Sequence, residues 1–144
     1  MEIPIIESSV IESDDCIVNL LHSLKLRPQK IDASIYAFDS DCFSLLYFPP
    51  SENKKSFTIA IPRIYNTETF PNKSVMTSLV NHVNNLIPAV KLSVIDNEVW
   101  AVYENIEFTS DVSASVVNKI IEQLKDAVCL FQTLVSMGSG NENT

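Results

Sequence analysis

Glycine is almost absent from this chain. Its two glycines, Gly138 and Gly140, both lie in the C-terminal stretch 138–144, so positions 1 to 137 contain none. Loops that bind phosphate groups need glycine, because only a residue without a side chain lets backbone amides approach the ligand closely. The sequence therefore excludes a P-loop, a dinucleotide-binding fingerprint and a nucleophile elbow.

Basic residues and long apolar runs are also scarce. Ten Lys and Arg stand against eighteen Asp and Glu, giving a net charge of -8. Binding to nucleic acid needs a basic stripe, and a negative protein is repelled by anionic membrane surfaces. No apolar run approaches the ~20 residues that span a bilayer. The start, Met1 to Glu7, lacks the features of a signal peptide. We expect a cytoplasmic protein that binds neither nucleic acid nor membrane.

The three cysteines are too few and too scattered for a disulfide framework. Cys16, Cys42 and Cys129 lie far apart, each inside an apolar segment. This arrangement predicts three buried free thiols in a reducing compartment, for which we expect a bacterial cytoplasm.

The length of 144 residues and the hydrophobic fraction of 46% match one domain with a real core. We expect a single domain over 1–144, with an ordered core of about 12–137 and a disordered tail, 138–144.

Hydrophobic spacing predicts three helices and five strands. Helices are expected at 14–26, capped by Ser13, and at 75–87 and 113–137. Alternating residues predict strands at 31–38, 42–48, 57–61, 90–94 and 99–103. Pro62 cannot donate to a sheet, so the third strand should end there or lie at an edge. The order α-β-β-β-α-β-β-α predicts the α+β class, with a mainly antiparallel sheet and helices packed on one face.

No catalytic constellation emerges from the residues. The two histidines, His22 and His82, have no partner at metal-ligand spacing on their own helices. We expect no catalytic residue, no metal and no cofactor, and therefore not an enzyme. A small hydrolase that uses Cys42 or Cys129 with either histidine is an alternative.

Apolar residues are expected on both faces of the sheet. Tyr36, Phe38, Leu46 and Phe48 fall opposite the predicted core set, and three helices cannot cover both faces of five strands. An uncovered apolar face is usually an interaction surface. Trp100, in the middle of a predicted strand, is either a core residue or an anchor for a partner.

Residues 79–87, a helix carrying asparagines, run into a hairpin formed by 90–94 and 99–104. With the element order, this segment resembles the type III secretion chaperone-like fold. That group includes the class I secretion chaperones and the YbjN-type bacterial proteins, which are putative sensory transduction regulators. The resemblance implies a homodimer without cofactor or catalytic residues that holds a segment of another protein.

The expected partner and dimer interface therefore combines two surfaces. One is the second predicted helix, with the C-terminal helix as the alternative seam, and the other is the sheet face. The identity of the protein partner stays open, as does the alternative of an immunity-type protein that neutralises a toxin. The predicted interface residues are Leu79, Val83, Leu86, Trp100, Tyr36, Phe38 and Phe48.

Overall fold

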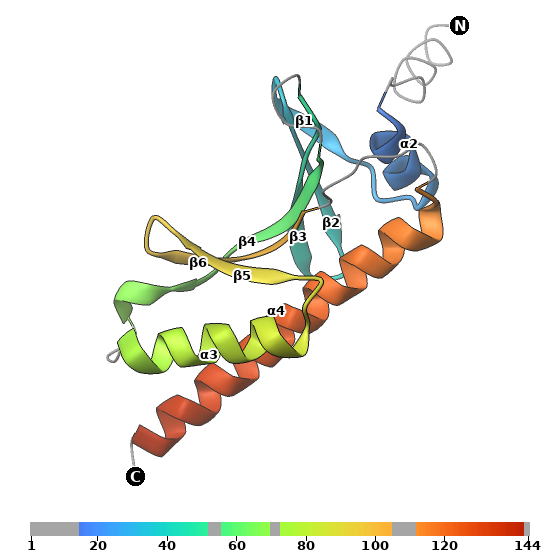
Figure 1. Ribbon diagram of the computed structural model, residues 1–144. Coiled ribbons are helices and arrows are strands. Elements are labelled where there is room, and N and C mark those ends of the chain that lie inside the picture. Colours follow the sequence, from blue (N-terminus) through green and yellow to red (C-terminus); the bar gives the residue numbers. More distant parts are fainter. Residues whose placement is uncertain (1–14, 52–55, 70–72, 105–111, 143–144) are drawn as a thin grey trace, which may run out of the picture.

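The computed structural model describes residues 15–51, 56–69, 73–104 and 112–142 (Figure 1). Within these ranges the chain forms three α-helices, six strands and one short 3-10 helix. The helices are α2 (Cys16–Ser23), α3 (Lys73–Leu86) and α4 (Ala114–Glu142), and the 3-10 helix η1 is Thr67–Thr69. The strands are β1 (Gln29–Asp32), β2 (Ile35–Ser40), β3 (Phe43–Phe48), β4 (Thr58–Asn66), β5 (Lys91–Ile95) and β6 (Glu98–Glu104).

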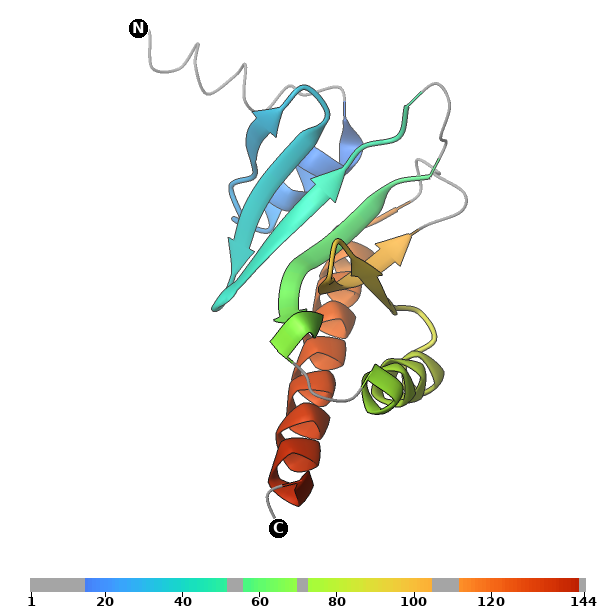
Figure 2. The same cartoon turned by 90° about the vertical axis from the view of Figure 1, so that its left-hand side faces the viewer.

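The six strands form one antiparallel sheet in the order β1-β2-β3-β4-β6-β5. All three helices lie on the same side of this sheet (Figures 1 and 2). Helix α4 crosses β4 and β6 and also contacts α2 and α3. The predicted α+β fold, with an antiparallel sheet and its helices on one face, is confirmed.

The stretch predicted as one strand at 31–38 is a hairpin. Asp32 pairs with Ile35, so the chain reverses at Ala33 and Ser34 and divides the run into β1 and β2. Alternation of apolar and polar residues continues through such a tight turn, and it therefore gave no sign of the reversal. The sheet has six strands instead of five because of this division.

The sequence suggested that the strand containing Pro62 ends at that residue or lies at a sheet edge, and both suggestions are wrong. Strand β4 continues to Asn66 and is central, paired with β3 on one side and β6 on the other. Its register against β6 shifts between Ile61 and Tyr65, and Arg63 there has a φ of 53°. Residues 62–64 of β4 lie opposite Trp100 alone, so this irregularity leaves residues outside the ladder and accommodates a proline without an N–H group within a central strand.

The turn between β5 and β6 forms without glycine, as the sequence predicted. Asp96 and Asn97 have φ angles of 52° and 65°, which are the positive values that a two-residue hairpin turn of type I′ requires. Asp and Asn tolerate this region because their short polar side chains hydrogen-bond locally.

Helix α2 is capped by Asp15. Its carboxylate accepts hydrogen bonds from the backbone N–H groups of Ile17 (2.8 Å) and Val18 (3.1 Å). The predicted cap, Ser13, lies outside the described residues. The helix ends at Ser23, earlier than predicted, because Lys25 adopts a left-handed φ of 65° and its N–H bonds the carbonyl of His22.

The long C-terminal helix buries the stripe that its spacing predicted. Ile120 and Ala127 widen this buried face, whereas Val116 is exposed. The helix extends past Met137, where the ordered region was expected to end, as far as Glu142. The stripe consists of Val117, Ile121, Leu124, Val128, Phe131 and Val135, all of them buried.

Two buried polar side chains tie the helices to the sheet. The hydroxyl of Tyr47, on β3, donates to both carboxylate oxygens of Asp15 at 2.9 and 2.8 Å. Lys125, on α4, donates to the Ser40 hydroxyl (2.7 Å), to Asp41 (2.6 Å) and to Glu122 (3.3 Å). Both anchors reach from one layer to the other and so fix the position of the helix layer.

These environments shift the ionisation of both groups. Burial, followed by the hydrogen bond to Asp15, raises the pKa of the Tyr47 hydroxyl. Burial lowers the pKa of the Lys125 amine, but hydrogen bonds to Asp41 and Glu122 more than offset that effect, so the net pKa is raised. Each group therefore holds its proton more firmly in the folded chain.

Candidate protein-binding surface

The face of the sheet opposite the helices carries a row of apolar side chains. Cross-strand partners point to the same side of a sheet, and Leu46 pairs with Ala60, which pairs with Val102. Figure 2 looks onto this side, where none of the helices in the described ranges lies in front of the strands. We call it the open face and define it by Ala37, Leu46, Phe48, Ala60, Trp100 and Val102.

The centre of the open face is tightly packed for a surface that no helix covers. Ala60, on the central strand β4, is only 1% exposed, and its partners Leu46 and Val102 are half-buried. Phe48 and Trp100 are also half-buried. Leu46, Ala60 and Val102 thus form an apolar stripe that crosses β3, β4 and β6.

Carboxylates surround this stripe. Asp39 and Glu104 are exposed and Glu98 is half-buried, and register places all three on the open face. The Ser44 hydroxyl donates to Asp39 at 3.0 Å, which holds that carboxylate at the surface. We call these three residues the acidic rim. The same face also carries one amine, Lys91, the cross-strand partner of Val102, so carboxylates outnumber amines there as they do in the whole chain, whose net charge is -8.

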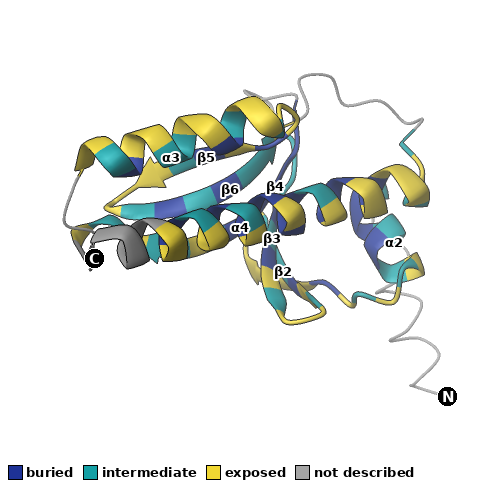
Figure 3. Cartoon of the chain, turned by 90° about the horizontal axis from the view of Figure 1, so that it is seen from below, coloured by how far each residue is buried: buried dark blue, intermediate teal, exposed yellow. Residues whose placement is uncertain are grey.

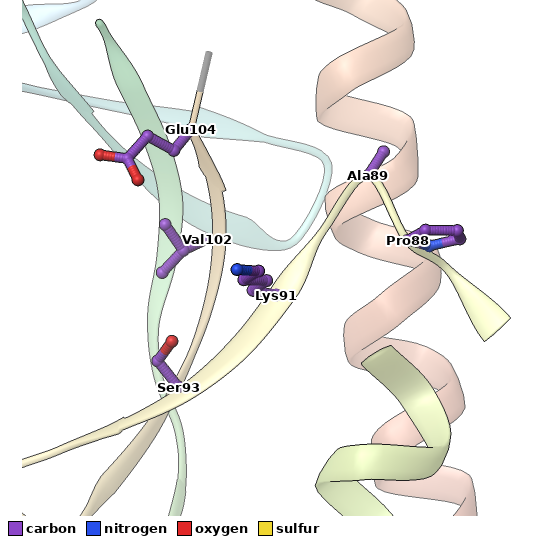
Figure 4. A pocket seen from close by; sticks show the side chains of 6 residues that line it. All are labelled: Pro88, Ala89, Lys91, Ser93, Val102 and Glu104. Atoms are coloured by element: carbon purple, nitrogen blue, oxygen red, sulfur yellow. The ribbon is translucent and has the colours of Figure 1, made fainter. Parts of the chain in front are cut away.

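A pocket of about 250 Å³ adjoins the stripe beside β5 (Figure 4). Its walls are apolar at Val102 and the loop before β5, and polar where a lysine and a glutamate project from neighbouring strands. Because Val102 also belongs to the open face, the pocket continues the apolar stripe toward the sheet edge. It is lined by Pro88, Ala89, Lys91, Ser93, Val102 and Glu104.

Three of the sheet residues that the sequence analysis named, Leu46, Phe48 and Trp100, lie on the open face. The expected placement is wrong for Tyr36 and Phe38, whose partners Tyr47 and Leu45 are core residues on the helix side. Phe38 is 4% exposed. The error follows from the hairpin at 33–34. The core side of the predicted strand 31–38 was assigned by extending the alternation of the residues before the turn into β2.

The sequence analysis did not single out Ala60 and Val102, which form the centre of the stripe. Their alternation with Ile59, Ile61 and Ala101 was visible, since successive residues of a strand face opposite sides. Their place on an uncovered face depends on which side the helices occupy, and one-dimensional spacing does not show that.

The predicted residues of α3 face three different environments. Val83 is fully buried in the chain's own core, Leu79 is half-buried against it, and Leu86 is 56% exposed. Helix α3 lies along β5 (Figure 3), and its stripe covers the helix side of that strand. Val83 is therefore unavailable to a second molecule.

The cysteines and histidines do not assemble into a site. Cys42, in the β2–β3 turn, and Cys129, on the solvent side of α4, are exposed, so the predicted burial of these thiols is wrong. Across the described ranges no thiol hydrogen-bonds to His22 or His82, and no cluster of three potential metal ligands occurs. Burial, then the negative charge of Asp15, raises the pKa of the Cys16 thiol, the opposite of nucleophile activation.

No helix in the described part of the chain is long and apolar enough to cross a membrane. No protein-family model and no curated protein sequence matches the chain.

Two solved structures have a similar fold. One is a chain of the HopA1–SchA chaperone–effector complex, with 12% identity and a TM-score of 0.58 over 80% of this chain and 88% of that one. The other is an uncharacterized protein from Methanothermobacter thermautotrophicus, with 12% identity and a TM-score of 0.59 over 85% and 95%. The chain therefore shares its fold with both proteins, one of which is a chain of a chaperone–effector complex.

Proposed function

We propose that the chain is a non-catalytic module that binds a segment of another protein on the open face of its sheet. The observation that carries this proposal is the apolar row Leu46–Ala60–Val102 on a face that none of the described helices covers. Contiguous apolar surface of this kind, with a polar rim, is characteristic of protein-interaction sites. The fold shared with a chain of a chaperone–effector complex supports a protein as the partner.

The chemistry of the open face defines the segment that fits it. Apolar side chains would cover the stripe, with the half-buried Trp100 as an aromatic anchor. Lys or Arg side chains would pair with the acidic rim, Asp39, Glu98 and Glu104, and electrostatic complementarity of this kind speeds association and selects partners. We infer that the preferred segment alternates apolar with basic residues.

We also propose that the chain is a homodimer. Leu86 on α3 and Val94 on β5 are 56% and 53% exposed, and these two elements contact each other. A two-fold pair would cover both side chains with one self-complementary patch. Helix α3 is the proposed seam, in line with the resemblance to secretion chaperones, and α4, with the exposed Met137, is the alternative.

Selection from a random peptide library tests the binding proposal. A phage-displayed library of 15-residue peptides is panned on the wild-type protein, after removal of phage that bind Leu46→Glu. A second counter-selection uses Asn81→Glu, which adds the same charge to an exposed position of α3.

Peptides that survive the Leu46→Glu step are expected to alternate apolar residues with Lys or Arg. Because Asn81→Glu leaves the open face unchanged, it should bind nearly all of these peptides, and the second counter-selection should therefore remove them. The opposite result, peptides that bind Leu46→Glu as well as wild type, or no enrichment at all, overturns the proposal.

A further inference from the structure

Strand β5 is one edge of the sheet, because it pairs only with β6 among the described strands. The backbone N–H and C=O groups of an edge strand form a template on which another chain can add a strand. Proteins that avoid such additions cover or interrupt the edge. In this chain a single side chain does so.

The side chain of Asn84, on α3, bonds both backbone groups of Leu92. The Leu92 N–H donates to Asn84 Oδ1 at 2.6 Å, and Asn84 Nδ2 donates to the Leu92 carbonyl at 3.3 Å. One donor and one acceptor facing one residue is the pair that an antiparallel neighbour offers at each hydrogen-bonded position. The Asn84 amide thus makes the two hydrogen bonds that a seventh strand would make at this position.

The orientation of Leu92 shows how few residues of β5 point their backbone groups away from β6. Both of its backbone groups turn away from β6, so its pair with Ala101 is of the non-hydrogen-bonded kind. Alternation gives Val94, two residues along, the same outward orientation. Of the five residues in β5, Leu92 and Val94 are therefore the outward positions, and Asn84 occupies the first.

The geometry of α3 holds Asn84 in place. The neighbouring residue, Val83, is fully buried and anchors the helix against the core. Figure 3 shows α3 running beside β5, and the two elements are in contact. Because Asn84 is itself half-buried, its amide is oriented by packing and not only by its two hydrogen bonds.

We propose that Asn84 guards the β5 edge and prevents a second copy of the chain from extending the sheet there. The guard restricts contacts of a second copy at this edge to side chains, whereas the opposite edge, β1, lies outside its reach. This inference concerns the edge and does not depend on whether the open face binds a peptide.

Removal of the amide tests the guard. In Asn84→Ala the outward groups of Leu92 become available to a second chain. We expect sedimentation at high micromolar concentration to give a mass at least about twice that of the wild-type assembly, because every copy gains an edge contact. The matched control, Asn81→Ala, removes an exposed asparagine one turn earlier on the same helix and should sediment like wild type.

A second variant identifies the contact. In Asn84→Ala with Val94→Pro, the second outward N–H of β5 is removed and the ladder is interrupted beside Leu92, because proline cannot donate to a ladder. The mass should fall back to that of Val94→Pro alone, which is measured alongside because Val94 also belongs to the proposed dimer patch. An Asn84→Ala protein that keeps the wild-type mass, or a double variant that associates further than Val94→Pro alone, overturns the guard.

Hydrogen exchange in the wild-type protein gives a test that does not require a variant to fold. Corrected for intrinsic rates, the Leu92 amide should exchange at least about tenfold more slowly than the Val94 amide, since only the first has a partner in Asn84. Equal protection of the two amides contradicts the proposal.

Discussion

Tyr47 is fully buried, and its hydroxyl has one described acceptor group, the Asp15 carboxylate that also caps α2. Tyr47→Phe removes a hydrogen bond to a charged group and leaves the ring in place. We expect the free energy of unfolding at pH 7 to fall by about 1.5–3 kcal/mol, as measured by urea denaturation. Tyr103→Phe on the same sheet face is the control and should stay close to wild type.

The same substitution alters the pH dependence. Unfolded Tyr47 loses its proton near the usual pKa of about 10, whereas the folded chain holds it to higher pH. The stabilisation is therefore complete below pH ~10 and is lost as the pH rises above it. Tyr47→Phe should show a shallower loss of stability between pH ~10 and ~12 than wild type. An unchanged slope would contradict the role given to this hydroxyl.

Lys125 is 6% exposed, but its partners Asp41 and Glu122 are largely exposed. Replacing Lys125 with an apolar side chain of similar length removes the buried charge, so that Asp41 and Glu122 no longer have a charge to compensate. We expect Lys125→Met to change the free energy of unfolding by less than about 1 kcal/mol.

Neutralising the partners instead keeps their hydrogen-bond acceptors but leaves the buried Lys125 amine without the negative charges of Asp41 and Glu122. The double variant Asp41→Asn, Glu122→Gln should be destabilised by about 1–2 kcal/mol, less than for a fully buried pair because water screens both carboxylates. Urea denaturation compares the two proteins, and the reverse order of stability contradicts this account.

Single residues also mark where sequence reasoning reached its limit. The positive φ angles at Asp96 and Asn97 were predictable, because turn chemistry is local. The exposure of Cys42 and Cys129 was not, because apolar neighbours in sequence do not show which side of a strand end or helix faces water. The role of Asp15 as cap and acceptor for Tyr47 joins residues 32 positions apart, a relation that spacing does not show.

Among the elements, α3 carries the proposed dimer seam, and exposure separates its residues. Leu86→Asp places a charge on a side chain that is 56% exposed within one chain, so the fold should survive while the dimer separates into 16.1 kDa monomers. Val83→Asp places the charge in the core and should abolish folding. Light scattering and thermal unfolding measure the two effects.

Asn85→Asp is the matched control for Leu86→Asp, since it adds the same charge to the exposed residue that directly precedes Leu86 on α3. Wild-type protein that is already monomeric refutes the homodimer. If Leu86→Asp stays dimeric and Met137→Asp separates the pair, the seam is α4 instead.

Element order and helix faces were largely predictable, whereas strand division was not. The stripe of α4 repeats every three to four residues, which fixes its buried side without knowledge of the partner. The run 31–38 alternates with period two through a reversal, so alternation could not distinguish one strand from a hairpin. That error moved Tyr36 and Phe38 from the helix side to the predicted interaction face.

For the whole molecule, the helices determine which apolar residues become a surface. All three cover one side of the sheet, so Leu46, Phe48 and Trp100 are left uncovered together with Ala60 and Val102, which the sequence analysis did not single out (Figure 2). The surplus of apolar residues over what three helices cover was evident from the sequence. Its location was not, because it follows from tertiary packing.

Trp100 is the only tryptophan and lies on the open face, so its fluorescence reports occupancy of that surface directly. A library-selected peptide is titrated into the wild-type protein, Leu46→Glu and Asn81→Glu while Trp100 emission is recorded. We predict a saturable change for wild type and Asn81→Glu, at least about tenfold weaker binding for Leu46→Glu, and weaker binding at high salt. A peptide that binds without changing Trp100 emission, or that binds Leu46→Glu equally well, contradicts the open face as the binding surface.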